Sequence, residues 1–150
     1  MKNDFFKLIV SGAGGVFRCH AHLHQAALES AQQMKLLVVP VELARARDKN
    51  SFLAAIAEAL QFPDYFGRNW DAFYDCLLEL KHGDGTGTLL VLRGVSGFAR
   101  AEPEEFAAAV GSLADAADHW KQEKKVLLAV LELDAPALAP ELSEISCRKG

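Results

Sequence analysis

Short, mainly apolar runs recur along this chain, and stretches with helical spacing of apolar residues separate them. Three of the runs, at residues 36–39, 88–92 and 126–133, lack polar alternation, which is typical of parallel strands covered on both faces. The stretches between them repeat apolar residues every three or four positions and so predict helices. This order predicts an α/β fold in which a small parallel β-sheet of three core strands is packed with helices.

The first third of the chain adds shorter elements to this pattern. Residues 5–10 and 16–22 each favour a strand, with a glycine-rich turn between them, and residues 25–34 favour a short helix. After the first core strand, Asn50 is placed to cap a helix that ends before Pro63. The sheet is therefore expected to gain one or two strands from the N-terminal part of the chain.

The same pattern suggests how the chain divides. Residues 1–35 are expected to form an N-terminal extension packed on the same domain, and residues 36–133 the main domain. Residues 134–150 contain two prolines and little periodicity, so an irregular, mobile C-terminal tail is expected there. At 150 residues the whole chain is the size of one domain.

The helix predicted over residues 69–80 has an unusual outer face. Its apolar residues share one side, and the opposite side carries Asp71, Tyr74 and Asp75 one turn apart, with no lysine or arginine at a matching position. Like charges at this spacing cost roughly a few tenths of a kcal/mol. Asp71 complements the helix dipole in the first turn, but Asp75 lies too far along the helix for that. The pair is placed for something other than helix stability.

The loop before this helix puts aromatic residues beside the acids. Tyr65 and Phe66 lie between Pro63 and Gly67, where a tight turn pushes at least one ring outward. Aromatic rings supply rigid contact area in protein interfaces, and carboxylates accept hydrogen bonds from arginine or lysine. The segment therefore indicates a surface that binds a cationic protein; the alternative is that the tyrosines edge the core and the acids form a solvated face.

Charge is unevenly distributed along the chain, although the net charge is only −4. Acids outnumber bases within residues 62–84, and residues 102–120 contain acids and no base, whereas the remainder is net positive. A negative face repels phosphate backbones, which disfavours direct nucleic-acid binding and favours a cationic protein partner.

Other features of the sequence concern its compartment. No stretch approaches the roughly 18 apolar residues of a membrane span, and the N-terminus lacks the pattern of a signal peptide. The three cysteines form no C-x-x-C pair and are expected to be reduced thiols. We therefore expect a cytoplasmic protein that does not bind membranes.

Residues 63–77, PDYFGRNWDAFYDCL, resemble the signature of the barstar-like family of intracellular ribonuclease inhibitors. The resemblance is specific, because proline, tyrosine, glycine, asparagine, two aspartates and a cysteine recur in register. The order of strands and helices from residue 36 to 133 also resembles that family. The resemblance implies a three-stranded parallel sheet whose second helix and preceding loop plug a ribonuclease active site.

The resemblance also implies which residues bind the partner: Tyr65, Phe66, Gly67, Asn69, Asp71, Tyr74, Asp75 and Asp118. Asp75 resembles the carboxylate that sits in the enzyme's phosphate pocket, with Asp71 beside it, and Tyr65 resembles the aromatic residue that covers the catalytic histidine. An acid on the last helix also reaches the partner in this family; Asp118 is the first candidate for it and Asp115 the second. A rigid carboxylate can satisfy cationic groups that normally hold a phosphodiester, so physical chemistry favours the same interpretation.

Two positions depart from the family pattern. Tyr74 stands where the prototype has tryptophan, and Arg68 stands where it has an acid, which puts a cation beside the acidic loop. These departures leave open a diverged barstar-like interaction module whose partner is not a nuclease.

A second alternative is a metal-binding protein built on His20, His22 and His24, which would share one side of an extended strand. Against it, no carboxylate partner stands nearby in the sequence. A cysteine nucleophile is disfavoured, because Asp75 and an inward orientation both raise the pKa of the Cys76 thiol.

The sequence therefore predicts a binding protein and not an enzyme, with no cofactor and no metal. Its predicted role is that of a proteinaceous ribonuclease inhibitor of the immunity or antitoxin type, monomeric when free. The predicted partner is a basic ribonuclease or a related toxin, bound by an acidic helix and loop.

Overall fold

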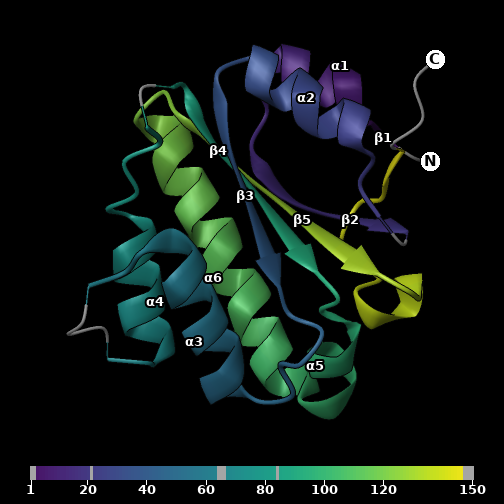
Figure 1. The fold of residues 1–150 in the computed structure, drawn as a ribbon, viewed down its shortest axis with the longest axis vertical. Helices are drawn as coiled ribbons and strands as arrows, with labels where there is room; N and C mark the ends of the chain where they lie inside the picture. Colours follow the sequence, from purple (N-terminus) through teal and green to yellow (C-terminus); the bar gives the residue numbers. More distant parts are fainter. Residues whose placement is uncertain (1–2, 21, 64–66, 84, 147–150) are drawn as a thin grey trace.

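The computed structural model describes residues 3–20, 22–63, 67–83 and 85–146. Four parallel strands form its central sheet in the order β2-β5-β4-β3. Their bounds are Gly15–His20 for β2, Leu36–Glu42 for β3, Gly87–Arg93 for β4 and Val126–Leu133 for β5. The predicted α/β fold with three core strands is confirmed, and β2 is the strand that the N-terminal part of the chain adds (Figure 1).

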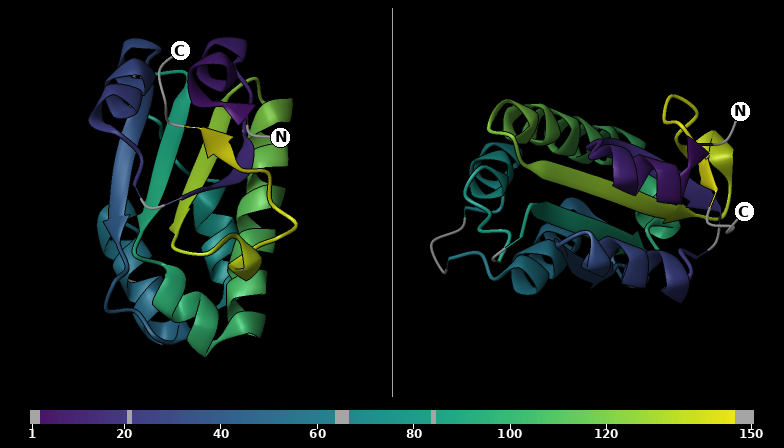
Figure 2. Two further views of the ribbon diagram at one scale, coloured as in Figure 1. Left: turned by 90° about the vertical axis from the view of Figure 1, so that its right-hand side faces the viewer. Right: turned by 90° about the horizontal axis from the view of Figure 1, so that it is seen from above.

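The two central strands are buried on both faces, as the lack of polar alternation in their sequences predicts. Every residue of β4 except Arg93 is buried, and every residue of β5 except Val126. In the part of the chain that the structure describes, six α-helices cover the sheet (Figures 1 and 2). Their bounds are Phe5–Ser11 for α1, Gln25–Gln33 for α2, Lys49–Leu60 for α3, Trp70–Leu77 for α4, Ser96–Ala101 for α5 and Pro103–Gln122 for α6.

Alternate residues of the central strands face two separate cores. Leu90 and Leu92 of β4 pack with buried residues of α3, α4, α5 and α6. Leu89 and Val91 pack on the other side, with buried residues of α1 and α2. The helix that follows β2 therefore covers one face of the sheet, and the helices that follow β3 and β4 cover the other.

The prediction of a strand over residues 5–10 was wrong, because these residues lie in α1. Phe5 and Ile9, one helical turn apart, are 0% and 5% exposed and pack in the core beneath α2. These six residues, apolar except for Lys7, are too few to show a period that separates strand from helix, so packing against the rest of the chain decides their structure. A two-residue strand, β1 (Asn3–Asp4), precedes the helix.

The C-terminal tail, expected to be irregular, contains two short elements in its described part. A 3-10 helix, η1 (Pro136–Leu138), follows β5, and β6 (Ile145–Ser146) pairs in parallel with β1. The backbone N–H of Arg18 in β2 donates to the carbonyl of Ser143 at 3.0 Å. The tail therefore runs back along the outer edge of β2.

The start of α3 differs from the prediction by two residues. Asp48, rather than Asn50, caps the helix, and its carboxylate accepts a hydrogen bond from the Ser51 N–H at 2.8 Å. The Ser51 hydroxyl bonds back toward the cap, which completes a capping box. Hydrogen bonds from Ser51 lower the pKa of the Asp48 carboxyl.

Within the described ranges, no helix combines the length and apolar character needed to cross a bilayer.

Candidate functional site

Helix α4 begins where the sequence predicts it. Asn69 is the N-cap, and its Oδ1 accepts a hydrogen bond from the Ala72 N–H at 2.8 Å. Arg68, the residue before the cap, has a φ of 50°, and its side chain is exposed. Asp71 lies in the first turn, where a negative charge complements the helix dipole. The amide oxygen of Asn69 thus fixes the first turn on which Asp71 stands.

Two tryptophans attach α4 to α6 at both ends. Trp70 Nε1 donates a hydrogen bond to Glu105 Oε2 at 2.7 Å, at the start of α4. Trp120 Nε1 donates to the carbonyl oxygen of Leu77 at 2.9 Å, at its end. Between these bonds, Phe73 lies in the core with no exposed surface. The predicted inward face is confirmed, and the helix is held along its whole length.

The outer side of α4 and the turn after it carry an acidic face, which we define as Asp71 and Asp75 of the helix and Glu79 of the turn. All three side chains are exposed, and they follow one another at intervals of four residues. Within the described part of the chain, the carboxylates of Asp71 and Asp75 form no ion pair and no hydrogen bond. Tyr74 is half-buried and packs against the core, so only part of its ring is available to a partner.

The structure brings some of the predicted binding residues together and not others. Gly67 is exposed beside the start of α4, whereas Tyr65 and Phe66 lie outside the described residues. Asp118 is exposed on α6. Glu105 and Trp120 mark the side of α6 that faces α4. At 100° per residue, Asp118 lies about 160° around α6 from Trp120 and so points away from α4. Asp115, also exposed, lies about 80° from Glu105 and is closer to the α4 side.

Sequence reasoning missed Glu105 and the two indole hydrogen bonds. The spacing of apolar residues does not reveal these bonds, because the acceptors of Trp70 and Trp120 are 35 and 43 residues away in the chain. It also left out Glu79, although the spacing from Asp71 and Asp75 was a usable signal.

The thiol of Cys76 lies on the flank of α4, partly buried. Burial raises its pKa, and the charges of Glu79 and Asp75 raise it further. The prediction of a raised thiol pKa is confirmed. Cys76 is therefore protonated near neutral pH and is a poor nucleophile.

The three histidines of the N-terminal part are all exposed. His22 Nδ1 lies 3.5 Å from Oε1 of Glu132, a residue of β5 that is 3% exposed. The sequence showed no carboxylate near these histidines; pairing of Cys19 with Glu132 between β2 and β5 brings one there. Among the residues that the structure describes, no group of three or more histidine, cysteine or acidic side chains is placed to hold a metal ion.

Comparisons with known proteins point to one family. The model of the family Barstar (barnase inhibitor) matches residues 36–132. A comparison with curated protein sequences found no significant match.

Solved structures show the fold alone. Two structures of the Aeropyrum pernix ORC2 protein, in its ADPNP-ADP complexes and its ADP form, superpose with TM-scores of 0.59 and 0.57 at 13% and 10% sequence identity. Each comparison covers 95% of this chain but only 44% of the ORC2 chain, so the likeness concerns less than half of that protein.

Proposed function

This chain belongs to the barstar family, and from that premise we propose that it inhibits a basic, barnase-like ribonuclease by covering its active site with the acidic face of α4. Barstar family members are inhibitors rather than enzymes. The matched region, residues 36–132, contains the whole of α4 and the loop before it.

The observation that carries the proposal is the state of Asp71 and Asp75. Both carboxylates are exposed, and the described residues offer them no internal cation. A ribonuclease must hold a phosphodiester with positively charged groups, and a carboxylate can accept hydrogen bonds from the same groups. Asp71 and Asp75 thus supply the negative charge that such an active site is built to bind.

The attachment of α4 to α6 supports the same function. A carboxylate that already has its bound position loses little conformational freedom when the partner arrives. The hydrogen bonds of Trp70 and Trp120 hold the helix at both ends, and the Asn69 cap fixes its first turn. The acidic face is therefore presented on a rigid support.

The test is inhibition of barnase, measured by titrating the enzyme with this chain while it cleaves a fluorogenic RNA. The wild-type chain should inhibit. Asp75→Ala should raise the inhibition constant by at least about tenfold, because it removes hydrogen bonds between charged groups. Thermal stability should stay the same or rise slightly, since a like-charge pair is removed.

Glu29→Ala is the matched control, since Glu29 is an exposed acid on α2, across the sheet from α4. It should inhibit like the wild type. If Asp75→Ala and Glu29→Ala weaken inhibition equally, only the net charge of the chain matters, and the role of the acidic face is refuted.

The second candidate is an interaction module of the same family with a non-nuclease partner. Arg68 favours it, because this exposed cation stands next to the cap of α4 where the family pattern has an acid. A folded wild-type chain that leaves barnase activity unchanged would support this candidate over the first.

A further inference from the structure

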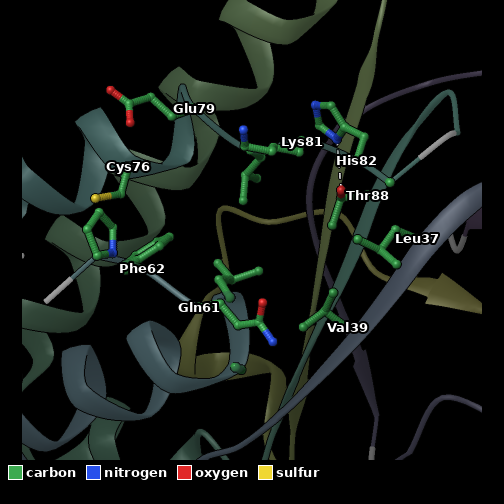
Figure 3. A pocket seen from close by; sticks show the side chains of 14 residues that line it. Leu37, Val39, Gln61, Phe62, Cys76, Glu79, Lys81, His82 and Thr88 are labelled. Carbon is green, nitrogen blue, oxygen red and sulfur yellow. Dashed lines mark hydrogen bonds between the residues drawn. The ribbon is translucent and has the colours of Figure 1, made fainter.

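A cavity of about 620 Å³ opens between the end of α3, the end of α4 and the edge strand β3 (Figure 3). Pockets of roughly 300–1,000 Å³ are the size that holds a small organic ligand. The acidic face touches the cavity only through Glu79. The cavity is thus a separate feature from the partner surface proposed above.

The walls of the cavity are mainly apolar. The apolar side chains come from β3 and from the ends of two helices and the segments after them: Leu37 and Val39 of β3, Leu60 at the end of α3, Phe62 just after α3, and Leu80 after α4. Leu37 is 45% exposed, which leaves a large aliphatic side chain in contact with water at this site. Removing such apolar surface from water is favourable. An apolar ligand body would gain this energy in the cavity.

One end of the cavity is polar and carries positive charge. There Thr88 Oγ1 lies 2.8 Å from Nδ1 of His82, and Lys81 is exposed beside them. Lys125 is close by, because its Nζ donates at 3.1 Å to the carbonyl of Gly85, whose own N–H bonds to the His82 carbonyl.

Glu79 is the one acid among the described residues that line the cavity, and its carboxylate turns away from this end. In Figure 3 the carboxylate of Glu79 points away from Thr88 and Val39, while Lys81 lies between Glu79 and His82. The cavity therefore combines apolar walls with a cationic rim.

From this arrangement we propose that the cavity binds a small amphipathic organic anion, whose chain or ring packs against Leu37, Val39 and Phe62 and whose acidic head lies at Lys81. Apolar walls with a few placed polar groups are the general form of a small-molecule site. The positive charge of Lys81 favours binding of an acid over a neutral molecule of the same shape. This inference does not depend on the identity of the protein partner.

The experiment uses sodium decanoate, below its micelle concentration, as the probe and decanol as its uncharged counterpart. Calorimetry of the full chain should show saturable binding of one decanoate. Ala59→Trp, which fills the cavity from α3, should weaken this binding by about tenfold or more. Ala54→Trp, a matched change in the same helix outside the cavity, should leave it unchanged.

The head group is tested with Lys81→Gln. This substitution should weaken decanoate binding by about threefold, the effect expected from loss of an exposed ion pair, and leave decanol binding unchanged. Lys121→Gln, at the end of α6, is the control for net charge and should affect neither ligand. An equal loss for decanoate and decanol would overturn the assignment of Lys81.

Amide chemical shifts of the wild-type chain locate the ligand without any variant that has to fold. Decanoate should move the signals of residues that line the cavity, such as Leu37, Gln61 and Cys76. The absence of saturable binding, or shifts confined to another part of the chain, would overturn the proposal. None of these outcomes bears on inhibition of a nuclease, so the two proposals fail separately.

Discussion

His82 shows how a single buried side chain sets a property of this protein. It is 4% exposed, its Nδ1 lies 2.8 Å from Thr88 Oγ1, and its ring meets the edge of Trp120 with centroids 4.4 Å apart. Burial lowers the pKa of its imidazole, and the charge of Lys125 lowers it further. The folded protein therefore holds this histidine neutral where the unfolded chain binds a proton.

This difference predicts a stability that depends on pH. Since the unfolded state binds more protons, the contribution of His82 is fully present above pH 6.5, the ordinary pKa, and is lost as the pH falls below it. Urea denaturation between pH 7.5 and 5 measures it as a falling free energy of unfolding.

His82→Asn is the comparison variant for this pH series. Asparagine keeps a polar group near Thr88 and tolerates the φ of 54° at this position. As the pH is lowered over the same range, the free energy of unfolding of the variant should fall less steeply than that of the wild type. Identical slopes for the two proteins would contradict the role of His82.

At the scale of elements, α4 owes its fixed position to the indole bonds at its two ends. Trp70→Phe keeps an aromatic ring but leaves Glu105 without its donor, and should cost about 2 kcal/mol because the acceptor is charged. Trp120→Phe removes a bond to a neutral carbonyl and should cost about 1 kcal/mol.

Hydrogen exchange measures whether this loss acts on the helix. In both variants the amides of α4 should exchange faster, while those of β4 should change only as far as global stability falls. Unchanged relative protection of α4 would show that packing of Phe73 alone holds the helix.

Elements with strong patterns were predictable, and those that depend on distant contacts were not. The inward face of α4 and the buried strands β4 and β5 follow from the spacing of apolar residues alone. The six-residue run at the start of the chain has no such period, and it became α1 because α2 covers it. Asn50 has a suitable side chain for the cap of α3, but the hydroxyl of Ser51 closes a capping box with Asp48 and so starts the helix two residues earlier.

Over the whole molecule, Glu132 joins the N-terminal part of the chain to the central sheet. Its Oε2 accepts a hydrogen bond from the Leu23 N–H at 2.7 Å, and its Oε1 faces His22 at 3.5 Å and Arg93 Nε at 4.0 Å. The acid is 3% exposed at the carboxyl end of β5. No pattern in the sequence joins residues 109 positions apart, so this contact could not be predicted.

Glu132→Leu tests the connection. It leaves the buried Leu23 N–H without its acceptor and Arg93 without its ion-pair partner, and should lower the free energy of unfolding by about 3 kcal/mol. Glu132→Gln, which keeps an oxygen for Leu23, should lose less. Urea denaturation of the three proteins gives the values, and a Glu132→Leu protein as stable as the wild type would contradict this role.

The acidic face is the center of the proposed function, and a double-mutant cycle tests it most directly. Asp75→Ala is combined with alanine substitutions of the cationic residues in the barnase active site, and the dissociation constants of all four pairings are measured. If Asp75 binds where the phosphate does, at least one cycle should give a coupling energy above about 1 kcal/mol. Additive losses in every cycle would show that Asp75 meets none of those cations and would contradict the account.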